Sequence, residues 1–469
     1  MIFQENRPAV GDATSPPAQV SFTPALIGSA IVAALGGFLF GFDTAVISGT
    51  TEALKTTFRL NENLLGFTVA IALIGTIIGS IFAGKPADIW GRKRALMVLA
   101  VLYFVGALGS ALAWNWYSFL AFRLLGGLAV GGASVVSPLY IAEISPARFR
   151  GRLVAAQQLN IVLGILVAFL SNYLIAQMNL GAAEWRWMLG IQVVPSALFF
   201  FLLFPTPESP RWLMARSRVD EARAVLSKIG VDGSGIDEEL ADIQRSLDLE
   251  HHEQGDSLFQ AKYQRPIFLA VAIAMFNQLS GINALMYYAP KIFEMAGAGK
   301  GSALLQSVAV GGTNLLFTML AMTVIDHFGR RKLILIGTVG YLISLGATAW
   351  AFYTYGTEFT PTGSLVVLAS LLMFIAAHAF GQGAVIWVFI SEIFPNRVRA
   401  QGQALGSTTH WVMAALITWT FPLIASRSGG HAFAFYTVMM FLQLLWALFL
   451  MPETKGVPLE AIQRKLGIE

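Results

Sequence analysis

The chain has 469 residues, of which 56% are hydrophobic and 12% are charged, and its formal net charge is +4. Soluble globular proteins carry about 25% charged residues, so this composition excludes a water-soluble protein and predicts a membrane protein. The small, scattered charge argues against nucleic-acid binding, and the absence of Cys excludes disulfides, thiolate metal sites and cysteine nucleophiles.

Twelve apolar stretches are long enough to cross a membrane as helices, which takes about 20 residues each. They are residues 24–49, 64–84, 95–113, 117–142, 153–178, 187–204, 267–289, 303–325, 333–352, 363–390, 405–424 and 432–450. The polar first 22 residues lack the apolar core of a secretory signal, so we expect the first stretch to remain as a membrane span. The expected fold class is therefore an all-α polytopic membrane protein.

The positions of the basic residues predict the orientation of the chain. Of the 31 Lys and Arg residues, 24 lie in the two tails or in alternate loops on the same side, and six lie in the other loops. Cytoplasmic loops are enriched in Lys and Arg, so both termini are expected in the cytoplasm of a multi-pass cell-membrane protein, of the bacterial inner-membrane type. The remaining basic residue, Arg123, lies inside the fourth span.

The longest polar stretch, residues 211–264, separates spans one to six from spans seven to twelve. Acidic and basic residues alternate along it, and the apolar residues Val219, Ala222 and Leu226 recur at helical spacing. This pattern predicts short amphipathic helices. We expect a helical linker on the cytoplasmic side and not a catalytic domain.

Three short segments recur in the two parts of the chain at nearly constant offsets. Asp-x-x-Gly-Arg at 88–92 recurs at 326–330, Ile-x-Glu-Ile-x-Pro at 141–146 recurs at 390–395, and Pro-Glu at 207–208 recurs at 452–453. A parallel duplication of a six-helix unit is typical of transporters whose halves rock around a central site. The predicted organisation is an N-terminal tail (1–22), a first half (23–206), a linker (207–264), a second half (265–451) and a C-terminal tail (452–469).

The recurring loops carry charges of both signs at equivalent places, which favours a role beyond orientation. We predict that they form a latch between the two halves on the cytoplasmic side and thereby bias the two open states. The alternative is that the basic members only signal orientation. The predicted latch residues are Asp88, Arg92, Glu143, Arg150, Asp326, Arg330, Glu392 and Arg399.

Four segments resemble signatures of the sugar porters of the major facilitator superfamily, and the resemblance extends from about residue 25 to residue 462. They are Gly-Gly-Phe-Leu-Phe-Gly-Phe-Asp-Thr-Ala-Val-Ile-Ser-Gly at 36–49, Pro-Glu-Ser-Pro-Arg-Trp-Leu at 207–213, Gln-Leu-Ser-Gly-Ile-Asn at 278–283 and Pro-Glu-Thr-Lys-Gly at 452–456. The resemblance implies the major facilitator fold, with two six-helix halves and a monosaccharide carried by alternating access. It implies neither an enzyme activity nor a cofactor.

Two ionisable residues inside the membrane, Asp43 and Arg123, form a candidate proton-coupling pair, because intramembrane charges are costly. Each lies six or seven residues from the outer end of its span, so at about 1.5 Å per residue both sit roughly 10 Å below the outer surface. The alternative is that each extends separately to the interface. Bacterial proton-coupled sugar porters resemble this chain in having Asp at position 43, whereas animal glucose facilitators carry Asn there, which implies proton coupling.

A sugar needs amide groups for its hydroxyls and flat apolar faces for its C–H groups. The predicted sugar-binding residues are Gln158 in the first half and Asn277, Gln278, Asn283, Asn314, Trp387, His410 and Trp411 in the second. The resemblance implies sugar contacts for all of these except Asn277 and His410. For a single Asn or Gln the alternative is packing between helices. For Tyr287 and Tyr288, a gate above the sugar competes with an anchor at the membrane interface.

Two residues depart from the family pattern. Asn277 stands where the family commonly has Gln, which predicts a shortened or water-mediated hydrogen bond to the sugar. His410 stands where an uncharged amide is usual, and it can donate to the sugar, titrate near neutral pH or pack beside Trp411.

The expected function is proton-coupled symport of a monosaccharide, with a glucose-type hexose favoured, by a protein that acts as a monomer in the lipid bilayer. The chain lacks the Gly-x-x-x-x-Gly-Lys-Ser/Thr phosphate loop of a transport ATPase. An uncoupled facilitator is the nearest alternative, separated mainly by Asp43. A sugar sensor is a further alternative, for which a long signalling tail would be expected where fewer than twenty residues follow Pro452.

Overall fold

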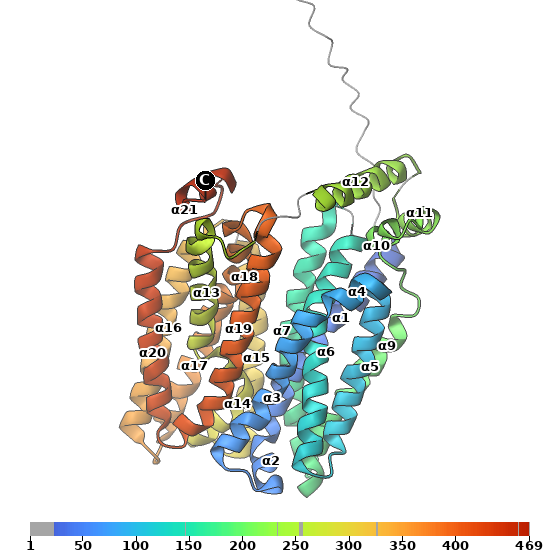
Figure 1. The fold of residues 1–469 in the computed structure, drawn as a ribbon. Coiled ribbons are helices and arrows are strands. Elements are labelled where there is room, and N and C mark those ends of the chain that lie inside the picture. The colour runs from blue at the N-terminus through green and yellow to red at the C-terminus, as the bar shows by residue number, and fades with distance from the viewer. Residues whose placement is uncertain are drawn as a thin grey trace, which may run out of the picture.

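The computed structural model describes residues 23–145, 147–231, 233–252, 257–324, 327–457 and 459–468. Every regular element in these ranges is a helix, and the helices form two blocks with short helices at one end (Figure 1). The first block comprises α1 (Pro24–Val46), η1 (Ile47–Thr50), α2 (Thr51–Phe58), α3 (Glu62–Phe82), α4 (Gly84–Trp90), α5 (Arg92–Ala111), α6 (Trp116–Ile144), α7 (Ala147–Gln177), η2 (Gly181–Ala183), α8 (Glu184–Gly190) and α9 (Val193–Leu202).

The second block follows three linker helices, α10 (Pro210–Ala215), α11 (Val219–Lys228) and α12 (Gly233–His252). It comprises η3 (Ala261–Tyr263), α13 (Gln264–Leu279), α14 (Ile282–Met295), α15 (Lys300–Val324), α16 (Arg330–Tyr355), α17 (Pro361–Phe380), α18 (Gln382–Ile393), α19 (Asn396–Ala425), α20 (Gly429–Phe449) and α21 (Leu459–Leu466). The two blocks are the predicted halves of the duplicated chain.

Eleven helical stretches of the described residues are long and apolar enough to cross a membrane. The remaining predicted span, residues 405–424, lies in α19. This helix is less apolar because it carries Ser407, Thr409 and His410. With α19 included, the predicted fold class, an all-α polytopic membrane protein of two six-helix halves, is confirmed.

The helices of each half pack mainly on one another, and a few helices join the halves. Within the first half α3 packs on α6 and α1 packs on α7, and within the second half α16 packs on α20. The halves meet where α3 contacts α19, α7 contacts α15, and α14 contacts η1 and α1. Gly66 allows α3 to approach closely, because any side chain there would overlap the backbone carbonyl of Trp419. In Figure 1, α2 and α14 lie at the end opposite the linker helices.

Four predicted spans are interrupted, including span 187–204, which is divided between α8 and α9. In the first, α1 gives way to η1 at Ile47, and the buried Asn172 side chain donates to the Val46 carbonyl at 2.9 Å. Span 267–289 is divided at Gly281, whose φ of +85° suits glycine and ends α13. Span 363–390 is divided at Gly381. Candidate functional side chains such as Asp43 and Gln278 lie close to these breaks, and interrupted helices are common in transporters.

The predicted amphipathic helices of the linker are present, and their apolar residues pack on the first half. Ala222, Leu226 and Leu240 are buried in the same cluster as Ala95 and Tyr140. The charged residues on the opposite faces, such as Glu221, are exposed. The linker is therefore anchored to one half and spans the distance to the other.

Candidate functional site

Asp43 of α1 and Arg123 of α6 form a buried, two-point ion pair inside the first half. One terminal nitrogen of Arg123 lies 2.8 Å from Oδ1 and the other lies 3.1 Å from Oδ2. The residues are 4% and 2% exposed, respectively, so neither side chain extends to the membrane interface. Such a pair is stable only while both charges are present, because removing one leaves the other buried and unpaired.

The ion pair is bordered by a glycine and keeps one guanidinium nitrogen without a partner in the part of the chain that the structure describes. Gly126 of α6 faces Asp43, and a Cβ there would lie 3.8 Å from Oδ1. The buried Nε of Arg123 has no hydrogen-bond partner among the described residues. The guanidinium group therefore depends on Asp43 for its neutralisation but retains a free donor, an arrangement that can change its contacts as helices shift.

In the second half, candidate sugar-binding amides lie at the end of α13, just before the break at Gly281. Asn277 and Gln278 are 3% and 1% exposed. The Nε2 of Gln278 donates to Asn277 Oδ1 at 3.0 Å and lies 3.2 Å from Nε2 of His410 on α19. The structure thus brings together three of the predicted residues, including both that depart from the family pattern.

Aromatic rings cover the same place. The His410 ring lies 5.1 Å from the Trp387 ring and 4.9 Å from the Trp411 ring, measured between centroids. From the first half, the Phe40 ring lies 5.5 Å from that of Trp411. Trp387 is 40% exposed. Flat apolar faces of this kind can pack against the C–H groups of a sugar ring.

The other predicted sugar contacts lie on neighbouring helices. Asn314 of α15 is 6% exposed, Asn283 of α14 is half-buried, and Gln158 of α7 is exposed. Their role in binding stays a prediction.

The two predicted gate residues, Tyr287 and Tyr288, are both buried, at 3% and 1% exposure. An interface anchor would face the lipid headgroups, so burial favours the gate over the anchor. The Tyr288 hydroxyl donates to the Thr418 carbonyl at 3.0 Å, and Tyr288 itself interrupts α14 with φ −131° and ψ 19°. Tyr287 packs in one cluster with Phe42 and Val46 of the first half.

The duplicated loops form equivalent charge clusters in the two halves. In the first half, Arg92 reaches Glu143 at 2.8 and 2.9 Å and Asp88 at 3.0 Å. In the second half, Arg330 lies 2.9 Å from Glu392. These pairs join residues of the same half.

The remaining predicted latch residues add no described contact between the halves. Asp326 lies outside the described residues, as does the side chain of Arg150. Arg399 is half-buried at the start of α19, and its Nε has no hydrogen-bond partner among the described residues. The latch therefore stays a prediction.

Two carboxylates that were not predicted as site residues complete these clusters. Glu208 accepts from the backbone N–H groups of Arg92 and Lys93 at 2.9 and 3.1 Å, and Glu453 accepts from that of Arg330 at 2.9 Å. Both cap the N-terminus of the helix that begins there. Burial raises the pKa of Glu208 above its ordinary value, although three backbone N–H groups donate to it. In the sequence, the recurrence of Pro-Glu at 207–208 and 452–453 is the feature that could have identified these two carboxylates.

Glycine is required where these carboxylates approach. Gly91 has φ +98° and Gly329 has φ +24°, and a side chain at either position would collide with the carboxylate of Glu208 or Glu453, respectively. The Gly-Arg pair of the repeated loops is thus explained by one contact that occurs twice.

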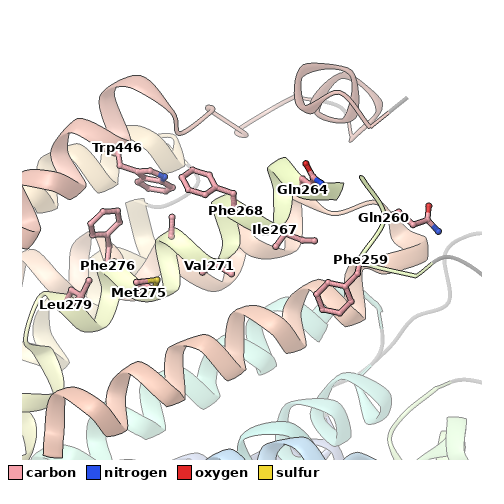
Figure 2. A pocket seen from close by; sticks show the side chains of 11 residues that line it. Phe259, Gln260, Gln264, Ile267, Phe268, Val271, Met275, Phe276, Leu279 and Trp446 are labelled. Carbon is pink, nitrogen blue, oxygen red and sulfur yellow. The ribbon is translucent and has the colours of Figure 1, made fainter. Parts of the chain in front are cut away.

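A groove with a volume of about 630 Å³ lies along the outer surface of α13 (Figure 2). Its wall is apolar, with Phe268, Met275 and Trp446 among the lining residues and with Gln260 and Gln264 towards one end. None of the predicted sugar-binding residues lines it. Phe268 is 53% exposed, as expected for a surface that faces lipid, so we do not assign the substrate to this groove.

Comparison with known proteins gives consistent matches over most of the chain. The family model described as "Sugar (and other) transporter" matches residues 29–466. The D-xylose-proton symporter of Escherichia coli is 38% identical, over 92% of this chain and 94% of its own. The glucose transport protein of Synechocystis sp. is 36% identical, over 92% of this chain and 95% of its own. The structure titled as the inward open conformation of the xylose transporter XylE from E. coli has a TM-score of 0.83 and 37% identity, covering 94% of this chain and 99% of that chain.

Proposed function

This chain belongs to the sugar transporter family of the major facilitator superfamily, and we propose that it carries a monosaccharide and a proton together across the cell membrane by alternating access. Gln158, Gln278, Asn283, Asn314, Trp387 and Trp411 contact the sugar, and Asp43 binds the proton. The protein acts as a monomer. The linker and both termini face the cytoplasm, because the basic loops lie on that side.

The buried ion pair of Asp43 and Arg123 carries the proton-coupling part of this proposal. The positive charge of Arg123 favours the ionised form of Asp43, whereas burial without a partner favours the neutral form. A shift of α1 relative to α6 within the first half, coupled to the rocking movement, therefore makes Asp43 take up a proton. Restoring the contact releases it, so proton binding follows the conformational cycle.

We infer that the conformation described above is the state open to the cytoplasm. In support, the contacts of α3 with α19 and of α14 with η1 hold the halves together at the end opposite the linker. The charge clusters at the linker end are paired within their own halves. Tyr287 and Tyr288 then close the outer path above the sugar.

A glucose-type hexose is the favoured substrate, with xylose as the competing sugar, since relatives with each printed specificity match over nearly the whole chain. Both sugars present ring hydroxyls and an apolar ring face, and they differ by one hydroxymethyl group. The amide and aromatic residues of the second half suit either of them.

Uptake by purified protein in proteoliposomes tests the proposal. Labelled glucose, galactose and xylose are supplied with and without an inward proton gradient. We expect one of these sugars to accumulate above its external concentration only with the gradient. Equilibration without accumulation would identify an uncoupled facilitator, and the absence of any saturable sugar uptake would reject sugar transport.

A further inference from the structure

A chain of buried amides runs from the candidate sugar site into the core of the second half. Asn277 of α13 donates to Oε1 of Gln382 on α18 at 3.3 Å. Gln382 donates to Oε1 of Gln443 on α20 at 2.7 Å, and Gln443 donates to the hydroxyl of Thr338 on α16 at 2.7 Å. Gln382, Gln443 and Thr338 are all 1% exposed or less. None of these three residues was among the predicted site residues.

Thr338, at the far end of this series of amides, fixes the direction of its hydrogen bonds. The Thr338 hydroxyl donates its one hydrogen to the backbone carbonyl of Ile334, at 2.7 Å, so towards Gln443 its oxygen can only accept. Gln443 must therefore turn its NH₂ to Thr338 and its carbonyl to Gln382. The same reasoning sets the orientation of the Gln382 amide and then of the Asn277 amide, because each carbonyl must face the NH₂ of the next amide.

The near end of the chain is Gln278. Its NH₂ group donates one hydrogen to Asn277 Oδ1, and the other points to the ring of His410, whose unprotonated nitrogen accepts it. Both hydrogens are thus held by the protein. The Oε1 of Gln278 is buried and has no hydrogen-bond partner among the described residues. Gln278 can therefore offer a ligand an acceptor but no donor.

We propose that Thr338, Gln443, Gln382 and Asn277 are positioning residues that hold Gln278 so that its Oε1 accepts a hydrogen bond from one sugar hydroxyl. The inference rests on the proposed function and assigns Asn277 to orientation of Gln278 instead of direct sugar contact. It makes the site selective for a hydroxyl that donates. A buried amide left free to rotate would present its NH₂ equally well and lose that selectivity.

Fluorinated sugars separate a donated from an accepted hydrogen bond, since a C–F group cannot donate. Binding of D-glucose, or of D-xylose if uptake favours it, is compared with binding of each of its monofluorinated derivatives by calorimetry. For the wild type we expect one position at which fluorine weakens binding by about tenfold or more. Loss of the donor leaves Gln278 Oε1 buried and unpaired at that position only.

The matched variants are Thr338→Val and Thr338→Ser. Valine has nearly the shape of threonine but removes the oxygen that sets the direction, whereas serine keeps it. We expect the fluorine penalty at the sensitive position to fall below about threefold in Thr338→Val and to stay near the wild-type value in Thr338→Ser. A purely structural role would lower the melting temperature and weaken all the sugars alike.

Gln382→Met provides a second interruption of the chain, nearer to the site, in case Thr338→Val does not fold. It too should reduce the fluorine penalty. An unchanged penalty in whichever variant folds would overturn the positioning role, as would a wild type that binds the parent sugar but shows no sensitive position. A wild type that binds no monosaccharide would instead reject the proposed function on which the inference rests.

Discussion

The two halves of the molecule have equivalent charge contacts at the linker end and different polar contacts in their interiors. At the linker end, Arg92 pairs with Glu143 in the first half as Arg330 pairs with Glu392 in the second. Glu208 and Glu453 cap the helices that begin with these two arginines. Inside the membrane, the first half buries the ion pair of Asp43 and Arg123, whereas the second half buries a chain of neutral amides.

This difference separates two tasks that a symporter must combine. A buried carboxylate beside a guanidinium can change its proton occupancy when the contact changes. Amides hold no charge at any pH, and they offer donors and acceptors in fixed directions. The ion pair of the first half is thus suited to follow the proton, and the amides of the second half are suited to recognise the sugar.

The largest effect is expected from Asp43→Asn, which tests the proton-coupling role of the first half. The amide keeps one hydrogen-bond acceptor for Arg123 but cannot release a proton, so accumulation of sugar against its gradient should be abolished. Exchange between equal sugar pools should continue in part, because it needs no net proton movement. Uptake and counterflow in proteoliposomes measure the two processes.

The exposed Asp248→Asn on α12 is the matched control for the loss of one carboxylate, and it should accumulate sugar as the wild type does. If Asp43→Asn still concentrates sugar, proton coupling lies elsewhere and the division of tasks between the halves fails.

The next effect concerns the second half. Gln278→Ala leaves a sugar hydroxyl without its partner, which should weaken binding by about 1 to 3 kcal/mol, or roughly five- to 150-fold. Proton-driven accumulation at saturating sugar should persist, since Asp43 is intact. Gln306→Ala on α15, half-buried and bonded to Ser302, is the control. Unchanged affinity by calorimetry would remove Gln278 from the site.

These predictions draw unequally on the sequence. The spans, the duplication and the Asp43–Arg123 pair could be anticipated, because apolar length and intramembrane charge are visible residue by residue. The resemblance to a family supplied most of the predicted sugar-binding residues. The partners of Gln278 could not be anticipated, because Gln382 and Gln443 look like ordinary packing amides in a sequence, and only their hydrogen bonds reveal a direction. Glu208 and Glu453 were visible as a repeat, but their role depends on the glycine turns that bring them to a helix N-terminus.

The breaks in the helices were also beyond the sequence pattern. Gly281 and Gly381 lie within apolar stretches, and other apolar stretches contain glycines that allow close helix packing, such as Gly66 and Gly127. Composition does not distinguish a glycine that ends a helix from one that allows two helices to touch. The backbone conformation at Gly281, with φ +85°, makes the distinction.

A third prediction tests whether the equivalent charge clusters of the two halves have the same role. The Arg92–Glu143 and Arg330–Glu392 pairs each lie within one half and persist as the halves rock, so at these loops only contacts between the halves change the balance of states. We expect Glu143→Gln and Glu392→Gln each to lose contacts that form when the cytoplasmic side closes, which shifts the population towards the inward-open state and slows turnover several-fold. Intrinsic sugar affinity of each state should change little.

Spin labels on the linker-side ends of α6 and α18 report the separation of the halves for these variants. An unaltered distance distribution together with wild-type transport in both variants would leave these residues as orientation signals only.

The smallest effect is expected at the end of the molecule opposite the linker helices, where charges pair across the halves. Glu184 of α8 lies 2.6 Å from Lys300 of α15, and Glu52 of α2 pairs with Lys291 of α14. These contacts must break when the outer side opens, so they stabilise the inward-open state. Glu184→Gln should therefore shift the distance distribution in the opposite direction from Glu143→Gln.

The magnitude of this last shift follows from exposure. Lys300 is 61% exposed, and an exposed ion pair contributes about 0.2 to 1 kcal/mol, which changes a two-state ratio by no more than about fivefold. Salt screens such a pair, so the difference between wild type and Glu184→Gln should be measurable at low ionic strength and disappear near 1 M salt. A shift in the same direction as that of Glu143→Gln, or one that survives high salt, would show that the two ends of the molecule do not oppose each other as the ion pairs indicate.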